Sequence, residues 1–187
     1  MKNLELNLGK VCNNRCVFCA TGMMSRDHAG WMDAGQVREA LARGRAEGAA
    51  SVGFIGGEPT LYKELVEVIA AAREAGFERI AICTNGRRLA RRERLEALLA
   101  AGLTRVTLSI HSHRADLEDR ITGRRGSFDE KIAAIRLLAE ARDAGRLPDG
   151  LALNTVLHAR NAAQREPLAA HFAGLGVDDL RLNFIRP

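Results

Sequence analysis

Short apolar runs alternate with longer stretches of helical periodicity along the whole chain of 187 residues. Within residues 61–75, for example, Leu61, Leu65 and Val68 recur at helical spacing and share one face. The apolar runs predict strands at 4–9, 51–55, 79–83, 105–110, 151–157 and 179–184. The helical patterns predict helices near 33–48, 61–75, 88–101, 127–144 and 162–174.

The ends of the predicted helices carry residues suited to capping. Asp33 and Asp129 lie near helix starts, where a side-chain acceptor satisfies free N–H groups. Gly76 and Gly102 follow helix ends, where glycine adopts the left-handed C-cap conformation. No low-complexity linker and no sequence repeat interrupts the pattern, so we expect one domain over residues 1–187.

Alternation of strands and helices predicts an α/β fold with a parallel sheet and right-handed crossovers. Two architectures compete at this point, an open doubly wound sheet and a barrel or partial barrel. Eight strand–helix units need about 250 residues, so a full barrel does not fit, whereas a six-stranded arc does. The first and last strands of such an arc are edges that need a cover.

Residues that fit a packed core poorly collect where the predicted strands end. In parallel α/β folds the ligand sites lie beyond the carboxyl ends of the strands, so these residues would share one rim. From the first strand to the last they are Cys12, Cys16 and Cys19, then Gly56-Gly57-Glu58-Pro59-Thr60, then Thr84-Asn85-Gly86, then Ser109, His111 and Ser112, then Asn154, and Arg186.

Cys12, Cys16 and Cys19 form a tight three-thiol group with no fourth cysteine nearby in sequence. Thiolates are the usual protein ligands of iron–sulfur clusters, and three of them leave one iron of a four-iron cluster open for chemistry. Zinc is the alternative, since it takes four ligands and His28 could supply the last. Clustered cysteines indicate metal binding in a reducing compartment, and the N-terminus lacks a signal-peptide h-region, so we expect a cytoplasmic protein.

Two further groups on this rim suggest ligand contacts. Gly56 and Gly57 allow close approach to the backbone, and the Glu58 carboxylate suits an ammonium ion; a glycine-rich turn with a solvated glutamate is the alternative. Ser109 and His111 lie two apart on a strand and could bond a sugar, or simply be polar residues at a sheet end.

The isolated polar or sulfur-bearing residues within strands are weaker candidates. Asn154 is a buried-amide candidate whose alternative role is a core hydrogen bond, and Cys83 is expected to be a small buried hydrophobe. Phe18, between the second and third cysteines, could shield a cluster or stack on a ligand, or only pack in the loop.

The net charge is +5 and the pI is about 9.4, and the densest basic segment is 87–94. A solvated helix face explains this arginine run; RNA binding is the alternative, but no aromatic residues interleave with it to stack on bases. No segment approaches the ~18 consecutive apolar residues of a membrane span. We therefore expect no membrane association and little contact with nucleic acid.

Three motifs in this order resemble the radical S-adenosylmethionine (SAM) superfamily over the whole chain. They are Cys12-Asn13-Asn14-Arg15-Cys16-Val17-Phe18-Cys19, then Gly56-Gly57-Glu58-Pro59, then Thr84-Asn85-Gly86. The resemblance implies a partial (β/α)6 TIM-like barrel of six parallel strands and a [4Fe-4S] cluster on Cys12, Cys16 and Cys19. It also implies that SAM binds the open iron and is cleaved reductively to a 5′-deoxyadenosyl radical that abstracts hydrogen from a substrate.

The resemblance assigns cofactor-binding roles by position. Glu58 with the Gly56 and Gly57 backbone would bind the methionine amino group, and Phe18 would lie by the adenine. Ser109 and His111 would contact ribose, although His111 stands where many relatives carry an acidic or amide group. Asn154 would contact ribose or the carboxylate, and Arg120 or Arg124 would pair with the carboxylate, Arg124 being preferred.

The resemblance also implies partners. They are a small-molecule or peptide substrate, as in peptide maturation or cofactor and natural-product biosynthesis, and an external one-electron reductant of flavodoxin or ferredoxin type. The printed sequence stops at Phe184-Ile185-Arg186-Pro187, so the last barrel helix is missing or truncated, and a lid would come from a further C-terminal segment or a partner. Two alternatives stay open: an RNA-modifying radical SAM enzyme, and a zinc or iron–sulfur structural module.

Overall fold

The computed structural model describes residues 2–19 and 30–184. Six strands form one parallel sheet in the order β1-β2-β3-β4-β5-β6, which is the order along the chain. The strands are β1 (Lys2–Asn7), β2 (Ala49–Ile55), β3 (Arg79–Thr84), β4 (Arg105–Ser109), β5 (Leu151–Leu157) and β6 (Asp179–Phe184). Sequential order with every neighbour parallel is the topology of a half-barrel, as expected for a partial (β/α)6 TIM-like fold.

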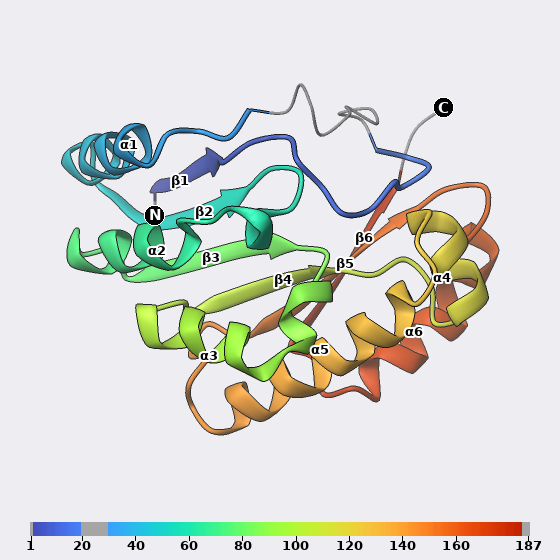
Figure 1. The fold of residues 1–187 in the computed structure, drawn as a ribbon. Helices are drawn as coiled ribbons and strands as arrows, with labels where there is room; N and C mark the ends of the chain where they lie inside the picture. Colours follow the sequence, from blue (N-terminus) through green and yellow to red (C-terminus); the bar gives the residue numbers. More distant parts are fainter. Residues whose placement is uncertain (1, 20–29, 185–187) are drawn as a thin grey trace.

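Helices cover the outer face of this arc (Figure 1). They are α1 (Ala34–Ala46), α2 (Leu65–Glu74), α3 (Arg92–Ala101), α4 (Ala115–Thr122), α5 (Ser127–Asp143) and α6 (Arg165–Ala173). Short 3₁₀ turns at Pro59–Leu61, Arg87–Ala90 and Ala162–Gln164 precede three of them. No helix in the described part of the chain is long and apolar enough to cross a membrane.

The two faces of the arc differ in polarity because side chains alternate along each strand. In β4, Val106 and Leu108 are fully buried beneath the helices, whereas Thr107 and Ser109 on the other face are partly exposed. The helix-facing positions of the other strands join the same core, and Ile80, Ile82 and Leu153 are typical of them. The concave face is therefore left for polar side chains and for a ligand.

Most expected elements appear within a few residues of their predicted bounds, and one helix was not predicted. Helix α4 carries acidic and basic residues on most of its turns, and it is held by burial of Leu117 and Ile121. Asp33 caps α1 by accepting from the N–H groups of Gly35 and Gln36, as predicted.

The capping prediction for Asp129 is wrong. The Asp119 carboxylate on α4 accepts from the backbone N–H groups of Gly126 and Phe128, at 2.6 and 3.0 Å, so the acceptor at the start of α5 comes from the preceding helix. Asp129 lies in the first turn of α5, where its charge still suits the helix dipole.

Candidate functional site

The three cysteines lie on the loop that follows β1 and runs past the carboxyl ends of the strands toward α4 (Figure 1). Two backbone hydrogen bonds dock this loop on the end of α4. The N–H of Arg15 donates to the carbonyl oxygen of Thr122 at 2.8 Å, and that of Val17 donates to Ile121 at 2.9 Å. The N–H groups of the loop thus donate to carbonyl groups that have no partner within the last turn of a helix.

Side chains from the end of β3 hold the other side of the same loop. Asn85 Nδ2 donates to Asn13 Oδ1 at 2.7 Å and lies 3.9 Å from Cys12 Sγ. Arg87 Nη1 donates to the Asn13 carbonyl oxygen at 2.9 Å and to Asn14 Oδ1 at 3.0 Å, while its Nε pairs with Glu130 on α5.

Arg87 is therefore a buried support of the cysteine loop, which sequence reasoning missed because it read 87–94 as one arginine run. The arginines of this run differ in burial, and Arg87 at its start is the buried one. Arg87 directly follows the Thr84-Asn85-Gly86 motif at the strand end, and that adjacency is the signal that would have separated it from its neighbours.

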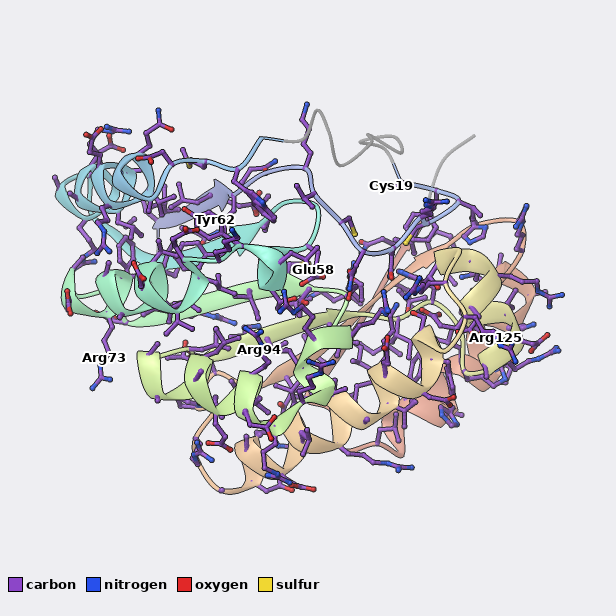
Figure 2. All side chains as sticks on the ribbon, viewed as in Figure 1. Cys19, Glu58, Tyr62, Arg73, Arg94 and Arg125 are labelled. Carbon is purple, nitrogen blue, oxygen red and sulfur yellow. The ribbon has the colours of Figure 1, made fainter. Side chains whose placement is uncertain are left out.

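Two of the three thiols are held in a setting that favours their neutral form. Burial is the main cause that raises the pKa of Cys12, and burial also raises the pKa of Cys16 to about 11, against an opposing contribution from the Lys131 ammonium. Cys19 is exposed (Figure 2). None of the four cysteines forms a disulfide, and a metal bound by the thiols would displace their protons.

The Glu58 carboxylate is fully buried and joins the ends of β2 and β3. Its Oε1 accepts from Thr60 N, Thr60 Oγ1 and Thr84 Oγ1 at 3.0, 2.6 and 2.5 Å, and its Oε2 accepts from Asn85 N at 2.7 Å. The Glu58 carboxylate thus accepts four hydrogen bonds from within the chain, so it is not the solvated glutamate of the alternative interpretation. Pro59 occupies the first position of the following 3₁₀ turn.

The two glycines before Glu58 are required because the backbone of residues 9–11 passes too close to them for a side chain. Gly57 N donates to Gly9 O and Glu58 N donates to Val11 O, both at 2.8 Å. A Cβ on Gly57 would lie 2.3 Å from Val11 O and 2.5 Å from Lys10 O, and Gly56 adopts a φ of +142°. The Gly-Gly-Glu turn is thereby joined to the start of the cysteine loop.

Phe18 rests on two histidines at the carboxyl ends of β4 and β5. Its ring meets His111 edge to face at 4.7 Å between centroids, and it lies 5.5 Å from His158. His111 is only 3% exposed, and its Nδ1 accepts from Val156 N at 3.2 Å, so the ring proton lies on Nε2. Burial, with Lys131 and His158 as lesser causes, holds the pKa of His111 well below its usual value, and the ring is neutral.

Behind this group lies an ion pair that sequence reasoning also missed. Lys131 Nζ donates to Glu118 Oε1 at 2.6 Å, and both side chains are wholly excluded from solvent. Glu118 Oε2 accepts from the backbone N–H groups of His111 and Ser112, at 2.7 and 2.8 Å. The pair therefore fixes the backbone at the end of β4 to both α4 and α5.

Ser109 and Asn154 lie opposite each other on neighbouring strands, on the concave face and both partly exposed. Asn154 Oδ1 accepts from Asn183 Nδ2 on β6, so it is neither deeply buried nor without a partner. Cys83, expected to be buried, is only partly so. Burial is the main cause that raises the pKa of this thiol.

The arginines expected at the SAM carboxylate are on the surface. Arg120 pairs with Asp116 at 2.7 Å, four residues away on α4, and both side chains are more than half exposed. Arg124 is exposed in the connection between α4 and α5, where its backbone N–H donates to Asp119 O. Its role at the carboxylate stays a prediction. The remaining candidates His28 and Arg186 lie outside the described residues.

Comparison with known proteins agrees with this architecture. Residues 6–165 match the family described as the Radical SAM superfamily. A probable GTP 3′,8-cyclase of Saccharolobus solfataricus is 30% identical over 188 residues, covering 100% of this chain and 58% of that protein. A GTP 3′,8-cyclase of Xanthomonas campestris pv. campestris is 36% identical over 184 residues, covering 94% of this chain and 52% of that protein.

Among solved structures, Streptococcus suis SuiB bound to S-adenosylmethionine matches with a TM-score of 0.80 at 20% identity. The match covers 99% of this chain and 41% of that one. The chain thus spans a little over half the length of the curated relatives it matches.

A half-barrel with three cysteines on the loop after its first strand defines a class of enzymes that bind an iron–sulfur cofactor at the strand ends. The chain belongs to the radical SAM superfamily. The cofactors of this superfamily are a [4Fe-4S] cluster and S-adenosylmethionine, and its members are enzymes.

Proposed function

We propose that residues 1–187 form the radical SAM core that performs [4Fe-4S]-dependent reductive cleavage of SAM. The observation that carries the proposal is the junction of the three-cysteine loop with the Gly-Gly-Glu turn, through the bonds from Gly57 to Gly9 and from Glu58 to Val11. When bound, the cluster supplies one electron to the sulfonium, and the resulting 5′-deoxyadenosyl radical removes a hydrogen atom from the substrate.

The donor set fits a four-iron cluster. Cys12, Cys16 and Cys19 would hold three irons as thiolates, the usual ligands of such clusters. The N–H of Asn14 already points at Cys12 Sγ at 3.4 Å, and hydrogen bonds to sulfur are one way in which a protein sets a cluster potential. In residues 2–19 and 30–184, no three Cys, His, Asp or Glu side chains lie close enough together to hold a single ion.

On the SAM side, the backbone carbonyl groups of Gly56 and Gly57 are the acceptors for the methionine amino group. Because the Glu58 carboxylate is taken up by four internal donors, it fixes these carbonyl groups and adds negative charge behind them. Phe18 lies by the adenine, with His111 packed behind its ring.

The remaining contacts to SAM would come from the concave face and from the connection between α4 and α5. Ser109 and Asn154 present polar groups toward ribose on that face. Arg124, the exposed arginine between α4 and α5, would pair with the carboxylate.

The substrate would lie over the concave face of the arc. Beside the serine and asparagine already named, this face carries Glu5 on β1 and Arg181 on β6, whose charges both act on Cys83. A polar substrate suits this lining. The curated relatives are named for action on GTP, so GTP is the first substrate to test, with peptides second.

Other partners follow from the same chemistry. An external one-electron reductant must supply the cluster, and a further segment or a partner must cover the open side so that water does not quench the radical. The reduced thiols that the cluster requires accord with a cytoplasmic location.

The test is anaerobic reconstitution with iron and sulfide, reduction with dithionite, and addition of SAM. We expect 5′-deoxyadenosine and methionine from the native protein and from Cys83→Ala. Cys12→Ala, Cys16→Ala and Cys19→Ala should each give none, with altered iron content. A loaded cluster that yields no 5′-deoxyadenosine would refute the proposal, and loss of the cluster in Cys83→Ala would show that the ligand set is incomplete.

A further inference from the structure

A basic hollow lies on the outside of the arc, between the connections that follow β2 and β3 and the helices α2 and α3. It is a small, partly open cavity of about 60 Å³ with an apolar floor and a cationic rim. Its lining includes Thr60, Tyr62, Lys63, Val66, Arg88 and Arg94. Figure 2 shows Arg94 beside α3, on the side that faces α2. We call this space the basic hollow.

The charge of the basic hollow is not balanced by its own lining. Lys63, Arg88 and Arg94 contribute three cations, and no aspartate or glutamate is among the described residues that line the space. Other arginines of the same run are neutralised elsewhere, Arg87 by Glu130 and Arg92 by Glu140.

Arg88 shows the consequence of this imbalance. Its side chain is half-buried, and burial, followed by repulsion from Arg94 and Arg91, lowers its pKa. An anionic group placed in the hollow would relieve both effects.

A short chain of contacts leads from the wall of the basic hollow to a cluster ligand. Thr60, which lines the hollow, donates through N and Oγ1 to Glu58 Oε1 at 3.0 and 2.6 Å. Glu58 Oε2 accepts from Asn85 N at 2.7 Å, and Asn85 Nδ2 lies 3.9 Å from Cys12 Sγ. Three residues in hydrogen-bond contact thus separate the hollow from a sulfur that would bind iron.

From this unbalanced charge and this proximity, we infer that the basic hollow is the docking surface for an acidic one-electron carrier protein. The inference rests on the proposed function and extends it to the partner. One electron would leave the reduced flavin or iron–sulfur group of the carrier and enter the [4Fe-4S]2+ cluster, giving [4Fe-4S]+, with no bond formed and no proton transferred. Charge complementarity speeds such encounters and makes them salt-dependent.

RNA is the other polyanion that a basic surface could take, and the structure favours it less. Tyr62, the aromatic residue of the lining, is buried and donates its hydroxyl to Met32 O at 3.0 Å, so it offers no face for a base. Stacking is a large part of single-strand recognition. The apolar floor, which includes the exposed Val66, instead suits the apolar centre of a protein interface.

The test compares two reductants on the same reconstituted protein. Arg88→Glu/Arg94→Glu should slow reduction by flavodoxin hydroquinone at least about tenfold at low salt, because the hollow would then repel the acidic carrier instead of attracting it. The salt dependence of the rate should also largely disappear. Reduction of the cluster by dithionite should stay at the native rate. The matched control is Arg73→Glu/Arg125→Glu, with the same change of net charge at two exposed positions away from the hollow (Figure 2).

Flavodoxin-driven reduction that is equally slow in both double variants would mean that net charge alone matters, and would overturn the inference. So would an unchanged rate in Arg88→Glu/Arg94→Glu. Loss of RNA binding in that variant, with carrier-driven reduction intact, would instead assign the hollow to nucleic acid. Failure of the proposed function is distinct, because the native protein reduced with dithionite would then give no 5′-deoxyadenosine.

Discussion

The Lys131 ammonium and the Glu118 carboxylate form an ion pair of 2.6 Å from which solvent is wholly excluded. The pair has a mechanical role, since the second carboxylate oxygen of Glu118 holds the N–H groups of His111 and Ser112. It also has an electrostatic role, because the Lys131 charge acts on both Cys16 and His111. One buried pair thus connects two outer helices to the end of β4 and to a candidate cluster ligand.

Breaking this pair on one side should be more harmful than replacing both partners. Lys131→Met leaves a buried carboxylate without its cation, and we expect a loss of about 3–5 kcal/mol in the free energy of unfolding. Glu118→Gln/Lys131→Met removes both charges and keeps an acceptor for the backbone, so it should lose less. Urea unfolding of the metal-free proteins measures both, and a double variant less stable than the single one would contradict the argument.

Arg87 should matter to cluster assembly more than any other arginine of its run. Arg87→Met removes two hydrogen bonds to the cysteine loop and the pair with Glu130. Hydrogen bonds to charged groups contribute about 1.5–3 kcal/mol each, so the loop should be less ordered before iron arrives. We expect faster amide exchange at residues 12–17 in the metal-free protein and a lower yield of loaded cluster.

Arg92→Met is the matched control, because Arg92 forms an exposed pair with Glu140 on the helix surface. Surface pairs of this kind contribute little to stability, because water and salt screen the attraction and both long side chains lose freedom when they pair. Equal amide exchange and equal cluster yield in the two variants would show that Arg87 does not position the loop.

The contrast between these two arginines shows where prediction from sequence stops. Strand and helix positions followed from periodicity, because burial against one outer layer imposes a regular pattern. The position of the three motifs at strand ends also followed from this pattern, and the structure brings them together there, whereas their roles as ligands stay a prediction. Arg87 and Arg92 stand five apart in one run, and only the packing of the 3₁₀ turn Arg87–Ala90 decides which is buried.

The Gly-Gly-Glu turn makes the same point. The sequence predicts that glycines allow a close approach and that Glu58 is available as an acceptor. Which group makes the approach is a matter of tertiary structure, and in the fold it is the backbone of residues 9–11. Helix α4 was missed because its apolar positions are few, and its partners lie on the cysteine loop and α5.

The buried His111 predicts a pH dependence of stability in the metal-free protein. The pKa of His111 in the folded protein lies well below its usual value, mainly because of burial. As the pH falls below the usual value, the unfolded chain therefore binds a proton at His111 that the native state does not bind. Stability should therefore be full above about pH 6.5 and fall as the pH is lowered, by at most about 1.4 kcal/mol per pH unit for one proton. His113 and His158, whose pKa values burial also lowers, add to this slope.

His111→Asn keeps an acceptor near Val156 N and does not titrate in this range. We expect its stability to decline less between pH 6.5 and pH 5 than that of the native protein, by about one bound proton. Urea titrations at several pH values give the slope directly. If the free energy of unfolding of the variant depends on pH as steeply as that of the native protein, groups other than His111 cause the pH dependence.

Glu58→Gln tests whether this carboxylate acts through the structure that it holds. Gln keeps one acceptor oxygen but replaces the other with an amide that cannot accept from Asn85 N, and it brings an N–H group toward donors that already point inward. Leaving a buried donor unsatisfied costs about 1–3 kcal/mol, so the metal-free protein should be destabilised by that amount. Because Asn85 also contacts the cysteine loop, amide exchange should rise there as well.

Affinity for SAM should fall too, because the carbonyl groups of Gly56 and Gly57 lose both their support and the negative charge behind them. Binding of SAM to the reconstituted protein, measured by calorimetry, separates the two contributions. A variant with native stability and native amide exchange but weakened SAM binding would show that the negative charge of Glu58, rather than the structure that it holds, sets the affinity. Normal binding in a destabilised variant would confine Glu58 to the fold.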